Sequence, residues 1–175
     1  DVTRGSARDR ALAGASVVDT PGVVSIPARS EDEAVTVRVL IEQPPRAILQ
    51  VGDAKNLRRA LLLTTQLAEL GRPLVLALNL QDEAEAAGVE IDAVLLAEMT
   101  GVSVQPTVAT RGRGVDRLPE LLASAEAPRP LVTYPAAIER AVAGCEPLVP
   151  ESVNSARALA VLWLAGDEST SQWIV

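Results

Sequence analysis

Short apolar runs along the chain predict strands of a parallel sheet. Residues 47–51 and 74–78 are almost wholly apolar and are bounded by turn-forming residues, as in strands buried on both faces. Residues 16–18, directly before Asp19, and residues 102–108 are two further strand candidates. We expect these segments to form the sheet of one domain.

Helical spacing of apolar residues separates these strands. It occurs over residues 56–68, 91–99 and 115–125, and Gly71 and Gly101 follow the first two at the position where glycine ends a helix. Alternating strands and helices are typical of an α/β fold, a parallel sheet with helices on its faces. Ligands of such sheets bind at the carboxyl ends of the strands.

The pattern changes near residue 127. Three prolines fall between residues 128 and 135 and mark a boundary, and helical spacing returns over residues 136–143 and 155–164. We therefore expect a sheet domain over residues 1–126 and the start of a helical domain over residues 127–175.

Composition excludes several kinds of function. The chain has 175 residues, 48% of them hydrophobic and 22% charged, which is typical of a folded globular protein. Its net charge of −7 disfavours a nucleic-acid partner, because acidic proteins gain nothing from releasing the counterions of phosphates. The absence of histidine excludes Ser-His-Asp catalysis and histidine-ligated zinc.

Asp19 and Gly22 follow the first strand candidate in the order Asp-Thr-Pro-Gly. In nucleotide triphosphatases an Asp at this place holds Mg²⁺ through water, and a glycine lets its backbone N–H approach the γ-phosphate. An ordinary Pro-Gly turn is the alternative reading.

Asn79 and Asp82 follow the central strand candidate with the spacing that guanine recognition needs. A carboxylate accepts hydrogen bonds from guanine N1–H and the 2-amino group, and adenine leaves that carboxylate unpaired. The alternative is an Asn cap followed by an exposed Asp. Farther along, Val108, Ala109 and Thr110 end the last strand candidate, where a small residue lets a backbone N–H reach guanine O6.

Order and spacing strengthen these three motifs. Asn79 comes sixty residues after Asp19, and Ala109 comes thirty residues after Asn79, each at a predicted strand end. Together they indicate a GTP-binding scaffold. By contrast, Ser30 and Glu33 have the spacing of a helix capping box, which we favour over a catalytic carboxylate.

The sequence resembles the cytosolic G domain of FeoB, the bacterial ferrous-iron transporter. Its most specific stretch is DAKNLRRALLLTTQLAELG, residues 53–71. The resemblance also rests on VDTPG at 18–22, SEDE at 30–33, ALNLQDEA at 77–84, GVEID at 88–92 and PTVATRGRG at 106–114, with similarity to the family's helical spacer after residue 133.

The resemblance implies a Ras-like P-loop GTPase fold that binds GTP or GDP with Mg²⁺, followed by a helical spacer. It also implies a membrane domain, absent here, that moves Fe²⁺ at the cytoplasmic face of the bacterial inner membrane. The sequence departs from the GTPase pattern because Gly-x-x-x-x-Gly-Lys-Ser/Thr occurs nowhere, so we expect an N-terminally truncated fold. Thr3 is the nearby candidate for a Mg²⁺-binding threonine, Leu80 replaces the usual Lys, and Val23 stands where Ras-like proteins have a catalytic Gln.

Three functions remain open on these grounds. The first is guanine-nucleotide binding that gates iron transport, with GTPase activity in the intact protein and none in this chain alone. The second is a soluble GTPase of the translation-factor kind. The third is a truncated remnant that binds no nucleotide.

Overall fold

A three-stranded parallel sheet forms the centre of the molecule in the computed structural model, which describes residues 2–150, 155–167 and 170. Its order is β3-β4-β5, with β3 at Ile48–Asp53, β4 at Leu74–Asn79 and β5 at Ser103–Pro106. Ile48 pairs with Leu74 at one end and Asp53 with Asn79 at the other, so the carboxyl ends of β3 and β4 coincide. The predicted α/β class is confirmed.

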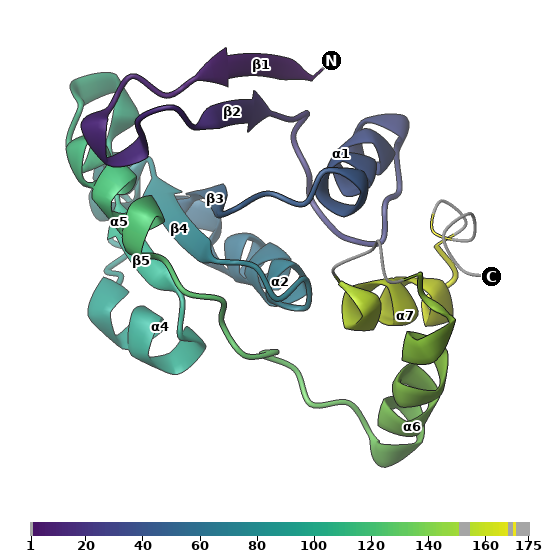
Figure 1. The fold of residues 1–175 in the computed structure, drawn as a ribbon. Coiled ribbons are helices and arrows are strands. Elements are labelled where there is room, and N and C mark those ends of the chain that lie inside the picture. The colour runs from purple at the N-terminus through teal and green to yellow at the C-terminus, as the bar shows by residue number, and fades with distance from the viewer. Residues whose placement is uncertain (1, 151–154, 168–169, 171–175) are drawn as a thin grey trace.

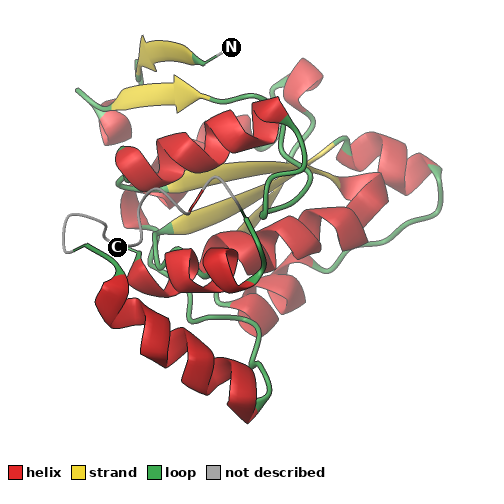
Figure 2. Cartoon of the chain, turned by 90° about the vertical axis from the view of Figure 1, so that its right-hand side faces the viewer, coloured by secondary structure: helices red, strands yellow, loops and turns green. Residues whose placement is uncertain are grey.

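The first strand candidate lies outside this sheet. Strand β2, Ser16–Asp19, pairs antiparallel with β1, Thr3–Ser6, in a separate hairpin that Figures 1 and 2 show along one side of the molecule. We predicted no strand at β1, because its sequence is polar. All four β1 residues are exposed, and alternation of polar and apolar residues, the usual strand signal, is absent there.

The described residues form seven α-helices. Their bounds are α1 Glu31–Glu42, α2 Leu57–Ala68, α3 Gln81–Ala86, α4 Ala93–Thr100, α5 Leu118–Ser124, α6 Ala136–Cys145 and α7 Ala156–Leu164. The short α3 was not predicted, since six residues are too few to show a helical period. Gly101 ends α4 in the left-handed conformation, φ 65°, as expected.

Burial differs between the two strands predicted to be fully buried. In β4, Leu74 to Leu78 are at most 2% exposed, as expected. In β3, Leu49 is 38% and Val51 64% exposed, so the prediction was wrong for this strand. Leu49 and Val51 point to the same face of the strand, and that face is the uncovered one, whereas Ile48 and Gln50 on the other face are buried. Among the described strands β3 pairs only with β4, so one of its edges is also free.

Helices α6 and α7 pack against one another beside the far end of α2 (Figure 1). Arg157 of α7 bonds Glu69 at 2.8 Å and Glu139 of α6 at 3.0 Å, and Ser155 Oγ donates to the Leu70 carbonyl at 2.9 Å. The helical segment therefore docks on the sheet domain, and the boundary at 126/127 stays a prediction. No helix in the described part of the chain is long and apolar enough to cross a membrane.

Candidate functional site

Asn79, the last residue of β4, joins two loops at the carboxyl end of the sheet. Its Oδ1 accepts hydrogen bonds from the Ala109 backbone N–H at 3.0 Å and from Thr107 Oγ1 at 3.2 Å. The Thr107 N–H donates to the Leu78 carbonyl at 2.8 Å, and the Gln81 N–H donates to the Thr107 carbonyl at 3.2 Å. Two predicted motifs thirty residues apart are therefore held together by one side chain.

Asp82 lies in the first turn of α3, one residue after the helix begins. The chain reaches α3 through Leu80, the one non-glycine residue with positive φ among those described, at 61°. This left-handed turn directly follows β4 and sets the start of α3 beside the Thr107–Arg111 loop. The Asp82 side chain is 25% exposed and pairs with Arg111, itself 72% exposed, at 3.4 Å. A carboxylate in this position has room to accept hydrogen bonds from a ligand.

Val108, Ala109 and Thr110, the predicted guanine-side residues, lie in the loop after β5. Val108 is 2% exposed and anchors the loop, whereas Ala109 and Thr110 lie at the surface in a short 3₁₀ turn. Gly112 and Gly114 follow with φ of 68° and 76°. A Cβ on Gly114 would lie 2.4 Å from the Pro106 carbonyl oxygen, so only glycine allows the loop to return to β5.

Asp19 and Gly22 lie at the end of the hairpin. Asp19 is exposed and pairs across the hairpin with Thr3, and a Cβ on Gly22 would meet no atom within 4 Å. Thr36 of α1 donates from Oγ1 to the Pro21 carbonyl at 3.1 Å and so fixes the Asp19–Gly22 turn to the helix. The described residues include no cluster of three or more His, Cys, Asp or Glu side chains that could hold a metal, so Asp19 offers Mg²⁺ a single carboxylate.

Glu33 holds the loop that follows Gly22. The residue is 5% exposed, and its carboxylate accepts from the backbone N–H groups of Arg29 at 2.7 Å, Val24 at 2.9 Å and Ser25 at 3.3 Å. Ser30 Oγ accepts from the Glu33 N–H at 3.2 Å, as a capping box requires. The reciprocal bond to Ser30 is replaced by bonds to the loop. Burial raises the pKa of the Glu33 carboxyl, but these three donors outweigh it and hold the pKa below its usual value.

The predicted site residues thus fall into two groups. Asn79, Asp82 and the loop at 108–110 come together, whereas no hydrogen bond or ion pair in the described structure links them to Asp19 or Gly22. Sequence reasoning missed Thr36 and Thr107, which position the loops through side-chain hydrogen bonds. Thr107 directly precedes the predicted site residues 108–110, and its hydroxyl, able to bond a neighbouring strand end, was the available signal.

The family model described as "Ferrous iron transport protein B" matches residues 2–122. Among curated relatives, an Fe(2+) transport protein A/Fe(2+) transporter FeoB fusion protein of Porphyromonas gingivalis is 34% identical, over 90% of this chain and 20% of its own length. The Fe(2+) transporter FeoB of Legionella pneumophila strain Lens is 41% identical, over 61% of this chain and 15% of its own length. This chain therefore spans about a fifth or less of these relatives.

Solved structures agree with the family match. The cytosolic domain of L. pneumophila FeoB has a TM-score of 0.84 and 30% identity, covering 98% of this chain and 69% of that one. NFeoB from S. thermophilus, bound to GDP.AlF4⁻ and K⁺, has a TM-score of 0.83 and 30% identity, covering 98% of this chain and 68% of that one. With the family model matching more than half of its residues, the chain belongs to the FeoB family of ferrous iron transport proteins.

Proposed function

We propose that this chain is the guanine-nucleotide-binding part of a GTP-dependent Fe²⁺ transporter, in which nucleotide binding gates iron transport. The observation that carries the proposal is the hydrogen bonding of Asn79, which joins the strand end before Asp82 to the loop at Ala109. Solved relatives that bind GDP.AlF4⁻ or GMPPNP share this fold. The relatives in the curated comparison are named as Fe(2+) transporters.

Base recognition rests on Asp82. One carboxylate oxygen would accept from guanine N1–H and the other from the 2-amino group, once the exposed Arg111 side chain releases its ion pair with Asp82. The Ala109 N–H is already donated to Asn79, so Ala109 keeps the loop in place. We assign guanine O6 to the backbone N–H of the next residue, Thr110. Val108, buried beneath the loop, anchors it.

The phosphate end is less complete in this chain. We propose that Asp19, which is exposed at the end of the hairpin, holds Mg²⁺ through a bound water, and that the backbone N–H of Gly22, where a Cβ would meet no atom within 4 Å, donates to a γ-phosphate. Mg²⁺ would neutralise phosphate charge there. The sequence has no Gly-x-x-x-x-Gly-Lys-Ser/Thr to cradle the β- and γ-phosphates, so we expect this chain alone to bind GTP more weakly than about 10 μM and not to hydrolyse it.

The proposed setting is the cytoplasmic face of the bacterial inner membrane, where a membrane domain outside this chain moves Fe²⁺. One relative of known structure is the cytosolic domain of L. pneumophila FeoB, and this chain covers only a small share of the named transporters. The family match favours this setting over a soluble translation-factor GTPase, whose nucleic-acid partner the net charge of −7 also disfavours.

The test is Asp82→Asn in the full-length transporter that carries this chain, titrated with fluorescent GDP and with xanthosine diphosphate. We expect GDP to bind at least about tenfold more weakly, because the amide cannot accept both guanine donors, and we expect the xanthine nucleotide to gain affinity. Glu98→Gln, an exposed neutralisation on α4, is the control and should change neither. Unchanged GDP affinity in the Asp82 variant would contradict the proposal. No GDP binding by the unaltered transporter would favour the non-binding remnant.

A further inference from the structure

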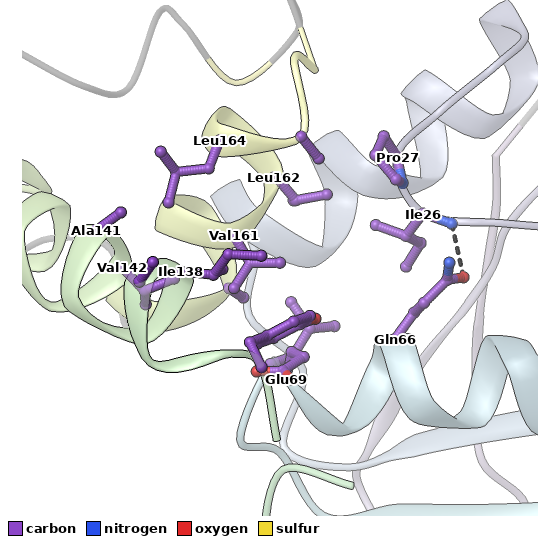
Figure 3. A pocket seen from close by; sticks show the side chains of 15 residues that line it. Ile26, Pro27, Gln66, Glu69, Ile138, Ala141, Val142, Val161, Leu162 and Leu164 are labelled. Carbon is purple, nitrogen blue, oxygen red and sulfur yellow. Dashed lines mark hydrogen bonds between the residues drawn. The ribbon is translucent and has the colours of Figure 1, made fainter. Parts of the chain in front are cut away.

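An apolar cavity of about 540 Å³ lies between the helical segment and the sheet domain. Figure 3 shows side chains from α6, α7, the end of α2 and the loop after β2 facing into it. Much of its wall is aliphatic: Ile26, Ile138, Val142, Val161 and Leu162. The volume lies within the range of small-molecule sites, and none of the candidate nucleotide-binding residues lines it.

One carboxylate interrupts this apolar wall. The Glu69 side chain is 5% exposed, and its Oε2 accepts from Arg157 Nε at 2.8 Å. Its Oε1 is buried and has no hydrogen-bond partner in the described part of the structure. Folded proteins rarely leave a buried polar atom unpaired, because its lost hydration is costly. The site therefore offers an acceptor for a donor that the described residues do not supply.

The charge around Glu69 indicates the kind of donor. Arg157 is shared, since its guanidinium also bonds both oxygens of Glu139, at 3.0 and 3.2 Å. The hydrogen bond from Arg157 lowers the pKa of the Glu139 carboxyl, which stays charged at neutral pH. One guanidinium thus faces two carboxylates, and the cluster has one negative charge in excess. A ligand with a single positive charge would neutralise it.

We propose that this cavity binds a small amphipathic amine, whose ammonium group donates to Glu69 Oε1 while its apolar body fills the aliphatic part. The ammonium supplies the missing donor and the missing charge together. The apolar body replaces water against the side chains of α6 and α7. This site is separate from the proposed nucleotide site, so its failure would leave the nucleotide proposal unaffected.

The experiment titrates the 175-residue chain at pH 7 with hexylamine, hexan-1-ol and hexanoate, followed by isothermal calorimetry. The amine and the alcohol share one hexyl chain, the carboxylate has a chain one carbon shorter, and the three probes differ in charge. We expect hexylamine to bind at least tenfold more tightly than hexan-1-ol, and hexanoate to bind most weakly. Glu69→Gln should remove the preference for the amine while the alcohol still binds. Equal binding of amine and alcohol by the unaltered chain would overturn the proposal.

A pair of variants on α6 locates the binding and does not depend on Glu69. Ala141 lines the cavity and is exposed, so Ala141→Leu should narrow the cavity and weaken hexylamine binding at least tenfold. Ala143→Leu adds the same side chain to an exposed position outside the cavity and should leave binding unchanged. Equal affinity of the two variants would place the amine elsewhere. If the chain self-associates and Ala141→Leu disrupts that association without any amine binding, a second copy fills the cavity and the proposal is wrong.

Discussion

Glu33 allows a quantitative test of how the loop after Gly22 is held. Replacing Glu33 by Ala removes three hydrogen bonds to one buried carboxylate, at 2.7, 2.9 and 3.3 Å. Each bond to a charged acceptor contributes about 1.5–3 kcal/mol, and the longest one least. Val24 is 42% exposed and Arg29 is also exposed, so their freed N–H groups regain water. We therefore expect Glu33→Ala to cost about 2–4 kcal/mol, less than the sum of the three.

Urea and thermal unfolding of the 175-residue chain measure this cost. A loss of this size lowers the melting temperature by about 5–15 °C in a chain of this length. Glu33→Gln should lose about half as much stability as Glu33→Ala. Its amide keeps one acceptor oxygen for the loop, but its NH₂ group faces the remaining backbone N–H and cannot accept from it. The control is Glu31→Ala, an exposed residue in the same helical turn. A Glu33→Ala loss within about 0.5 kcal/mol of the control would refute the reasoning.

The pH dependence of stability checks the same contacts independently. Although burial raises the pKa of Glu33, its three backbone donors leave it below the ordinary carboxyl value of 4.5 in the folded state. The unfolded chain then takes up the proton first as the pH falls. The stability that wild type has over Glu33→Gln should be complete above about pH 5, decrease near the ordinary value, and disappear as the pH falls through the folded-state pKa. A constant difference down to pH 3 would contradict the assignment.

Three further predictions concern the backbone and the docking of the helices. Gly114→Ala should lower the free energy of unfolding in urea by more than about 2 kcal/mol, because φ is 76° and the new Cβ would lie 2.4 Å from the Pro106 carbonyl oxygen. Gly112→Ala, which has open space around the new Cβ, should lower it by only about 1 kcal/mol. Leu80→Asn should raise the melting temperature slightly, because asparagine tolerates the left-handed conformation that leucine adopts at φ 61°. Arg157→Met should release α6 and α7, so that limited proteolysis cuts the linker before α6 faster than in wild type.

Several features followed from the sequence because their physical cause is local. The apolar run at Leu74–Asn79 determined a buried strand, since nearly every side chain in it is excluded from water. The glycine after α4 determined the end of that helix, because few other residues tolerate its φ. Asn79 and Asp82 were identified by spacing at a strand end, and the structure places Asn79 against the Ala109 loop.

Tertiary structure decided what depends on distant partners. Sequence did not show that β3 would expose Val51, because exposure depends on what packs against each face of the strand. The polar strand β1 arises from pairing with β2, and its own side chains carry no signal. Glu33 was recognised as a cap, but its bonds to the loop after Gly22 depend on how that loop folds back over α1. The unpaired oxygen of Glu69 emerges only when residues 69, 139 and 157 meet, because hydrogen bonds and charge balance in a buried cluster are set by contacts far apart in the chain.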